Sequence, residues 1–142
     1  MLKNIPNILS PELLKILMEM GHGDELVIAD GNFPAASIAQ RLIRLDGHGV
    51  TEILDAVLKF FPLDIYVDKP VGLMAVTPGD DVKPTIWEDY RKIIEESKEK
   101  FSDFESIERF KFYERAKNAY AVIATSESAL YANIILKKGI VV

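Results

Sequence analysis

The side chain best suited to chemistry in this sequence is His22, which lies in the tetrapeptide Gly21-His22-Gly23-Asp24. Its imidazole ring can both donate and accept a proton near neutral pH. The flanking glycines let a ligand approach the backbone closely and do not oblige the ring to pack in a core. The chain has only 2 histidines, so a proton-transfer role for His22 is a specific hypothesis. The alternative is a solvated histidine in a loop.

The other histidine, His48, lies in a similar setting between Gly47 and Gly49. It precedes a segment with helical spacing, so its alternative role is to serve the turn before that helix. Two histidines so far apart in sequence are weak evidence for a metal site, and we expect no metal. The chain also has no glycine-rich phosphate loop and no nucleophile-elbow serine, so those chemistries are set aside.

Further along the chain, polar groups that suit a ligand occur at three places. Asp30 follows a buried apolar run, where open α/β sheets gather ligand-binding groups; otherwise it is an ordinary turn aspartate. Arg109 has a simpler role available, a surface pair with Glu105 if that segment is helical. The stretch Tyr131-Ala132-Asn133 supplies a phenol and an amide. In an extended segment both would project to the same side and suit hydrogen bonding to hydroxyl groups, the alternative being a sheet surface with one packed tyrosine.

The composition indicates a soluble globular protein with one core. The chain has 142 residues, of which 49% are hydrophobic and 27% charged, close to the average for such proteins. Its formal charge of -5 repels a phosphate backbone and argues against nucleic acid as a partner. It has no cysteine, which excludes disulfides, thiolate metal sites and thiol nucleophiles. No run approaches the roughly 20 apolar residues of a membrane span, so we expect a cytoplasmic protein with no membrane partner.

Several segments have the spacing of amphipathic helices. Ser10-Pro11-Glu12 opens the first, because serine caps free amides, proline suits the first turn and glutamate complements the helix dipole. Gly21 ends it, since glycine readily takes the left-handed conformation that ends helices. The expected helices are residues 10–21, 51–61, 84–100 and 112–118.

Short apolar runs bounded by turn residues predict the strands. The expected strands are residues 26–29, 41–45, 65–67, 71–76, 120–124 and 134–136. The segment 104–110 is left open between strand and helix. The alternation of strand and helix predicts a single α/β domain over 1–142, with three α/β/α layers around a mixed, mainly parallel sheet.

Three separated motifs resemble one known family. They are Ile8 to Lys15 followed by Glu19-Met20-Gly21-His22-Gly23-Asp24-Glu25, Arg109 to Ala116, and Tyr131 to Gly139. The first is similar to the opening of the D-ribose pyranase and L-fucose mutarotase family, and the other two are similar to its fucose mutarotase branch. The resemblance covers nearly the whole chain.

This resemblance implies a role for each candidate residue. The family's proton donor is the histidine of the Gly-His-Gly-Asp motif, here His22, and its sugar-binding aspartate corresponds to Asp30. Arg109 stands where the fucose branch has arginine and the ribose branch has histidine, which favours L-fucose as the substrate. The stretch Tyr131-Ala132-Asn133 matches the remaining substrate-binding segment, whereas His48 matches nothing catalytic.

The family's assembly bears on the site as well. Its proteins form ring-shaped homo-oligomers, decamers among them, with sites at subunit interfaces. By this resemblance the partners of the chain are a small monosaccharide and further copies of itself. We therefore expect a neighbour's Tyr131 and Asn133 to complete the site.

The implied reaction is acid-base catalysis without cofactor or metal. Opening a cyclic hemiacetal requires a proton delivered to the ring oxygen and one removed from the anomeric hydroxyl; after rotation about the C1–C2 bond, closure reverses both transfers. His22 would carry the proton, and Asp30 would orient the imidazole or a sugar hydroxyl. The alternatives left open are a D-ribose pyranase, a non-catalytic sugar-binding protein and a scaffold whose oligomer is its function.

Overall fold

Capping groups in the sequence mark the start of two of the helices. In the computed structural model, which describes residues 1–142, the Leu13 amide donates to the Ser10 hydroxyl at 3.2 Å and Pro11 occupies the first turn. At a later helix the Gly49 amide donates to the Glu52 carboxylate at 3.0 Å. The five helices are α1 Pro11–Glu19, α2 Ala35–Ile38, α3 Val50–Leu58, α4 Ile86–Ser97 and α5 Arg109–Asn118.

A six-stranded sheet runs through the molecule in the order β2-β5-β1-β6-β3-β4. The strands are β1 Glu25–Ala29, β2 Leu42–Leu45, β3 Val71–Met74, β4 Glu105–Ile107, β5 Ala121–Thr125 and β6 Ile134–Lys137. The pairs β1–β5, β2–β5 and β3–β4 are parallel, whereas β6 pairs antiparallel with both β1 and β3. The predicted mixed, mainly parallel sheet is therefore confirmed.

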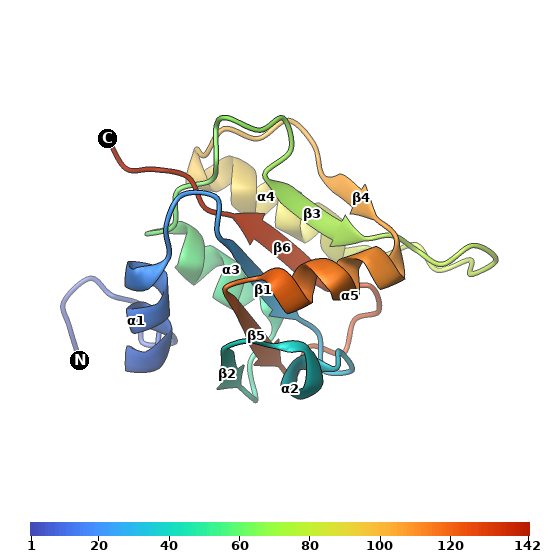
Figure 1. The fold of residues 1–142 in the computed structure, drawn as a ribbon, viewed down its shortest axis with the longest axis horizontal. Coiled ribbons are helices and arrows are strands. Elements are labelled where there is room, and N and C mark those ends of the chain that lie inside the picture. The colour runs from blue at the N-terminus through green and yellow to red at the C-terminus, as the bar shows by residue number, and fades with distance from the viewer.

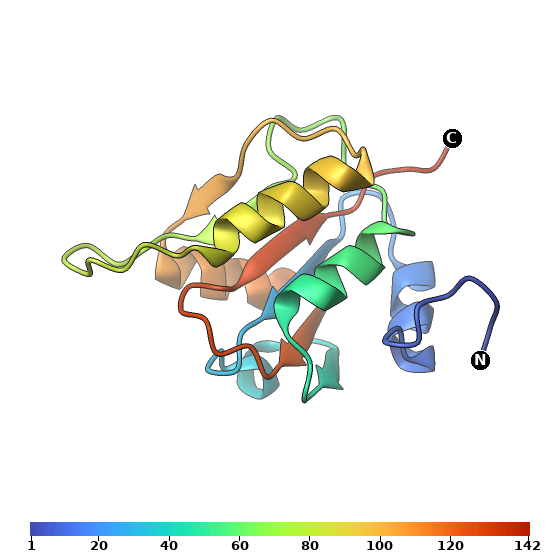
Figure 2. The same ribbon diagram turned by 180° about the vertical axis from the view of Figure 1, so that it is seen from behind.

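Helices cover both faces of this sheet and make the three layers that the sequence predicts. Figure 1 shows α2 and α5 in front of the strands, and Figure 2, from behind, shows α3 and α4 on the opposite face. Side chains alternate across a strand, so successive residues of β1 enter different core clusters. Leu26 and Ile28 pack in the cluster that contains residues of α1, α3 and α4. Val27 and Ala29 pack in the cluster that contains residues of α5. The strand β1 thus contributes to both cores.

The predicted strand at 65–67 is wrong. This segment is irregular, and only an isolated bridge between Leu63 and Lys138 connects it to the sheet. The Tyr66 amide donates to the Asp64 carboxylate at 3.0 Å, a side-chain turn that competes with strand pairing. Ile65 and Tyr66 consequently face solvent, with 51% and 68% of their surface exposed.

Other differences concern boundaries and short elements. The helix α2 was not predicted, because a four-residue helix is too short to show a helical period. The segment left open at 104–110 contains both β4 and the start of α5 at Arg109. The predicted helix over 84–100 ends earlier, at Ser97, where Lys98 adopts the left-handed conformation with φ of 65°. No helix has the combination of length and apolarity that crossing a membrane requires.

Candidate active site

A cavity of about 270 Å³ lies beyond the carboxyl end of β1 and brings together most of the predicted binding residues. Its polar lining includes Asp30, Arg109, Tyr131 and Asn133, and Phe33 and Met74 add apolar surface. Asp30 directly follows β1, and Asn133 directly precedes β6, the antiparallel neighbour of β1. The topology therefore brings residues far apart in sequence together at one end of these two central strands.

Asp30 is nearly buried in this cavity, with 9% of its surface exposed. Its backbone amide donates to the side-chain oxygen of Asn133 at 2.7 Å, and its carboxylate accepts the Asn32 amide at 3.0 Å. Burial raises the pKa of the Asp30 carboxyl, and hydrogen bonds from Asn32, Phe33 and Ala132 act in the opposite direction. A carboxyl with a raised pKa is suited to exchanging protons or accepting from a sugar hydroxyl.

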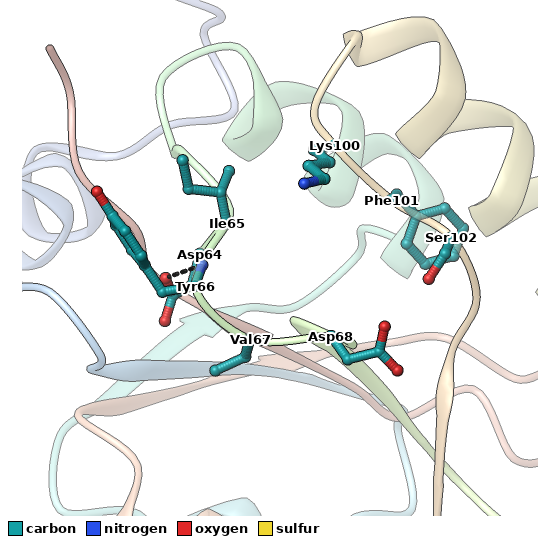
Figure 3. A pocket seen from close by; sticks show the side chains of 8 residues that line it. All are labelled: Asp64, Ile65, Tyr66, Val67, Asp68, Lys100, Phe101 and Ser102. Atoms are coloured by element: carbon teal, nitrogen blue, oxygen red, sulfur yellow. Dashed lines mark hydrogen bonds between the residues drawn. The ribbon is translucent and has the colours of Figure 1, made fainter.

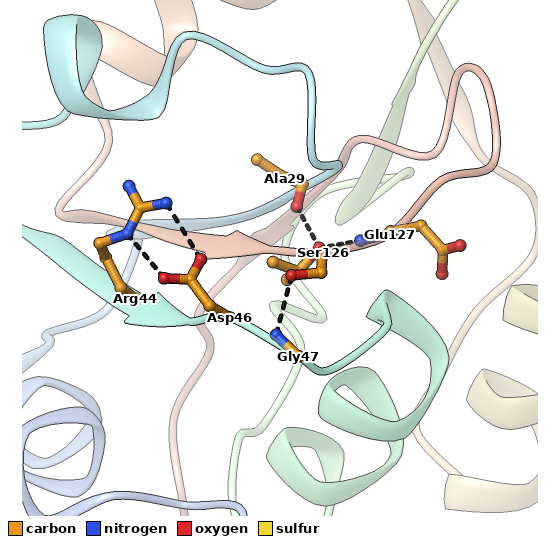
Figure 4. Close-up of polar contacts among 7 residues, drawn as sticks. Ala29, Arg44, Asp46, Gly47, Ser126 and Glu127 are labelled. Carbon is orange, nitrogen blue, oxygen red and sulfur yellow. Dashed lines mark hydrogen bonds and ion pairs between the residues drawn. The ribbon is translucent and has the colours of Figure 1, made fainter.

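The ends of the parallel strands are tied together where Asp30 begins. The Thr125 hydroxyl, at the end of β5, donates to the Ala29 carbonyl at 2.7 Å and accepts the Glu127 amide at 3.1 Å. Next to it, the Gly47 amide donates to the Ser126 hydroxyl at 2.8 Å (Figure 4). These contacts fix the backbone from which the Asp30 side chain enters the cavity.

The stretch Tyr131-Ala132-Asn133 is held from α4. The indole of Trp87 donates to the Tyr131 carbonyl at 2.8 Å, and the buried Tyr90 hydroxyl donates to the Ala132 carbonyl at 2.6 Å. The stretch is not extended as expected, because Tyr131 has a φ of 55°. Ala132 is fully buried in the core, while the phenol of Tyr131 and the amide of Asn133 both reach the cavity. The shared direction of these two groups is therefore achieved by a turn.

Two further contacts orient the cavity's charged groups. The Tyr131 hydroxyl donates to the carboxylate of Asp80 at 2.6 Å. Asp80 belongs to the segment between β3 and α4, a loop that projects away from the sheet (Figure 1). Arg109 donates from Nε to the Tyr113 hydroxyl at 3.0 Å, and that phenol raises the pKa of Arg109. The expected surface pair of Arg109 with Glu105 is wrong, because Arg115 takes Glu105 at 2.8 Å.

His22 lies at the opposite end of β1 from this cavity. It precedes the strand and Asp30 follows it, so the five residues of β1, at about 3.3 Å each, separate the two side chains by roughly 17 Å. One copy of the chain therefore does not bring His22 to Asp30, Arg109, Tyr131 or Asn133. The expectation that Asp30 orients the imidazole does not hold within a single chain.

The acid that does contact His22 is Asp64, at 3.1 Å between Nε2 and Oδ1. The His22 ring also lies 5.5 Å from the Tyr66 ring, centroid to centroid, and its side chain is 45% exposed. Asp64 and Tyr66 line a second cavity of about 410 Å³, with Asp68, Lys100 and Ser102 on its rim (Figure 3). His22 is thus accessible and paired with a carboxylate.

His48, by contrast, serves the start of α3. Its ring pairs with Glu52 at 3.1 Å between Nδ1 and Oε1, and Glu52 in turn accepts the Gly49 amide. This agrees with its alternative role in the turn. No three His, Asp or Glu side chains come together as a metal site.

Comparison with known proteins gives these residues a family context. Residues 3–141 match the model of the RbsD / FucU transport protein family. The chain belongs to this family. An L-fucose mutarotase of Actinobacillus pleuropneumoniae is 49% identical over 99% of this chain and 97% of that relative. A crystal structure of the fucose mutarotase of Streptococcus pneumoniae in complex with L-fucose has a TM-score of 0.95 and 55% identity, covering 99% of this chain and 100% of that one.

The RbsD / FucU family also includes a more distant relative. The structure of Bacillus subtilis RbsD complexed with D-ribose has a TM-score of 0.76 and 25% identity, covering 100% of both chains. The fold of this chain, a single mixed sheet between helical layers, is the fold of these RbsD and FucU structures. The chain is 55% identical to the fucose mutarotase but only 25% identical to RbsD, which groups it with the fucose mutarotases.

Sequence reasoning missed the residues of this RbsD / FucU chain that support the site from elsewhere in the fold. They are Asp64, which contacts His22, and Asp80, Trp87 and Tyr90, which contact the 131–133 stretch. Each lies at least 42 residues from its partner in sequence. A lone tryptophan in an amphipathic helix was one available signal, because its indole N–H requires a partner when it is partly buried.

Proposed function

We propose that this protein is an L-fucose mutarotase, an isomerase that interconverts the α and β anomers of the free sugar. The observation that carries this conclusion is the 0.95 TM-score and 55% identity to a fucose mutarotase whose structure holds L-fucose. The chemistry of the cavity supports it independently. Asp30, Arg109, Tyr131 and Asn133 line it with acceptors and donors that suit several hydroxyl groups.

The reaction follows from the groups available. A donor delivers a proton to the ring oxygen, the anomeric hydroxyl loses one, and the C1–C2 bond rotates before closure reverses both transfers. His22 carries the proton to and from the sugar. Asp30, Arg109, Tyr131 and Asn133 hold the remaining oxygens. Positioned acid-base catalysis of this kind supplies a factor of about a hundred to ten thousand, enough for a reaction that already proceeds slowly in water.

The apolar side of the cavity fits the same substrate. In L-fucose, C5 carries a methyl group in place of a hydroxymethyl group. Phe33 and Met74, with 8% and 5% of their surface exposed, line the cavity beside the polar groups. Burying a methyl group against such side chains stabilises the complex by about 0.8 kcal/mol.

The proposal includes a site shared between two copies of the chain. His22 and the Asp30 cavity occupy opposite ends of β1, so His22 of one copy faces the cavity of a neighbour in a ring-shaped homo-oligomer, with a decamer as the proposed assembly. The grouping differs from the one expected at first, because Asp30 and Arg109 belong with Tyr131 and Asn133. Exposed Ile65 and Tyr66 beside His22 supply apolar surface for the contact.

Saturation-transfer NMR between the anomeric protons of L-fucose tests the activity. The wild-type protein should accelerate exchange and His22→Ala should not, while His48→Ala, the matched histidine control, should behave as wild type. If wild type accelerates anomer exchange no more than His22→Ala does, the proposed catalysis is refuted and a sugar-binding protein remains as the alternative.

The same assay tests the choice of sugar. The alternative suggested by Bacillus subtilis RbsD is a D-ribose pyranase. Faster pyranose-to-furanose exchange of D-ribose than anomer exchange of L-fucose would favour that alternative and show that Arg109 does not select the sugar. The cytoplasmic location is also a proposal, which fractionation of cells that produce a tagged chain would test.

A further inference from the structure

The loop between β3 and α4 reaches the cavity that follows β1. Thr77 and Asp80 of this loop line the cavity together with Arg109 and Tyr131. The Tyr131 hydroxyl donates to Oδ2 of Asp80 at 2.6 Å and accepts the Thr77 backbone amide at 3.3 Å. A single loop therefore supplies both hydrogen-bond partners of this phenol.

The backbone of the loop fixes the Asp80 carboxylate. The Asp80 amide donates to the Thr77 carbonyl at 3.0 Å, and Gly79 between them has a φ of 90°, a conformation that glycine adopts readily. The Val82 amide donates to Oδ1 of Asp80 at 3.1 Å. Oδ1 is thus bound by the loop itself, and Oδ2 is presented to Tyr131.

The charge of Asp80 decides the direction of the hydrogen bond to Tyr131. The hydrogen bonds from Tyr131 and from the Val82 amide lower the pKa of the Asp80 carboxyl below its usual value, and desolvation opposes them less strongly. Asp80 is therefore ionised at neutral pH. An ionised carboxylate only accepts hydrogen bonds, so the phenol of Tyr131 is the donor.

The remaining hydrogen-bonding capacity of Tyr131 follows by counting. A phenol oxygen carries one proton and has lone pairs for about two acceptor bonds. Asp80 takes the proton, and the Thr77 amide takes one lone pair. One lone pair is left for a ligand. Tyr131 can therefore accept from a sugar hydroxyl, but it cannot donate to the ring oxygen of a sugar, because that oxygen is itself an acceptor.

We propose that Asp80 is a positioning residue for sugar recognition, one that takes the only proton of the Tyr131 hydroxyl and makes this hydroxyl an acceptor for one hydroxyl group of the sugar. The inference rests on the proposed function, in which Tyr131 holds a sugar oxygen. Asp80 acts through Tyr131. A site built in this way rejects a sugar that lacks the donating hydroxyl, because an acceptor is then left without its partner.

Fluorinated sugars test whether Tyr131 accepts. In a deoxyfluoro-L-fucose, one hydroxyl is replaced by fluorine, which cannot donate a hydrogen bond. ¹⁹F NMR titrations give the dissociation constants of the analogues with fluorine at C1, C2, C3 or C4, and competition gives that of L-fucose. The ratio of the two constants is the fluorine penalty at each position.

The comparison with Tyr131→Phe identifies the hydroxyl that Tyr131 binds. We expect one position at which a penalty of about tenfold in wild type disappears in Tyr131→Phe, because the phenylalanine ring has no acceptor to leave unpaired. If no position differs between the two proteins, Tyr131 accepts from no sugar hydroxyl and the proposal is overturned. This comparison needs no change at position 80.

The substitution Asp80→Asn then tests the role of the carboxylate. The Val82 amide keeps the amide oxygen of the new side chain at the place of Oδ1, so its nitrogen faces the Tyr131 oxygen and donates to it. The phenol proton is thereby free to turn to the sugar. The fluorine penalty at the position that Tyr131 binds should fall from about tenfold to less than about threefold.

The matched control is Asp81→Asn, which removes the same charge from the neighbouring exposed residue. It should keep the wild-type penalty at every position. A substitution that merely loosened the loop would weaken L-fucose and all analogues alike and leave the ratios unchanged. Unchanged ratios in Asp80→Asn would therefore refute the role of Asp80.

The outcomes separate this inference from the proposed function. If the protein does not bind L-fucose, both fail. If it binds L-fucose without accelerating anomer exchange, the proposed function fails, while the fluorine penalties still decide the role of Asp80. If the protein is an active mutarotase and Asp80→Asn keeps the wild-type penalties, only the inference about Asp80 is refuted.

Discussion

Complementation between two inactive variants tests the shared site quantitatively. His22→Ala removes the proposed proton carrier at one end of β1, and Asp30→Asn removes the carboxylate at the other. Because the two positions lie roughly 17 Å apart along the strand, each complete site of the proposed ring would take His22 from one copy and Asp30 from its neighbour. An oligomer of either variant alone therefore has no complete site.

A mixed oligomer should recover activity by simple counting. In a random one-to-one mixture about half of the copies keep His22 and about half keep Asp30, so about a quarter of the interfaces hold both groups. We expect co-production of the two variants, with different purification tags, to restore about a quarter of the wild-type anomer exchange rate. Each variant purified alone and re-mixed with itself serves as the control, and sedimentation confirms that the oligomers form.

If mixed oligomers assemble and remain as inactive as each variant alone, the two groups act within one copy or do not act together. A wild-type protein that is fully active as a monomer would refute the shared site without any variant.

Three further substitutions test the site and the packing of the sheet. Asp30→Asn should stabilise the fold at neutral pH while abolishing exchange, because burial raises the pKa of this carboxyl: its stability contribution is full below the unfolded pKa and is lost as pH rises through the folded one. A melting temperature that is unchanged at neutral pH would contradict this. Gly72→Ala should lower the free energy of unfolding, measured in urea, by about 1 to 3 kcal/mol, because the alanine Cβ would lie 2.5 Å from the side chain of Ile107. A variant as stable as wild type would show that the Ile107 side chain moves aside at no cost. Tyr131→Phe removes the 2.6 Å hydrogen bond to Asp80 and should raise KM for L-fucose about threefold to tenfold in the NMR assay. An unchanged KM would mean that this hydrogen bond does not position the Tyr131 ring.

The sequence predicts the framework of this fold well because the signals are local. Ser10 and Pro11 mark the start of α1 through groups that act within one turn. The apolar runs at 26–29 and 134–136 become β1 and β6 with small shifts at their ends. The strand expected at 65–67 failed because a run of apolar residues does not reveal that a neighbouring aspartate turns the chain away from the sheet.

The candidate site was predictable as a set of residues but not as an arrangement. Asp30 and Asn133 meet because β6 returns antiparallel beside β1, and strand order depends on the packing of the whole sheet. The separation of His22 from Asp30 follows from the length of β1, yet only the structure shows that Asp30 lines the cavity at one end while His22 contacts Asp64 at the other. Asp64 carries no mark in the sequence that distinguishes it from any other turn aspartate.

The hydrogen bond between Trp87 and the Tyr131 carbonyl gives the protein a built-in optical probe. Trp87 is the chain's single tryptophan, so all indole fluorescence originates beside the segment that borders the Asp30 cavity. A titration with unlabelled sugar can therefore be followed by intrinsic fluorescence, with no dye attached and no other indole to obscure the signal.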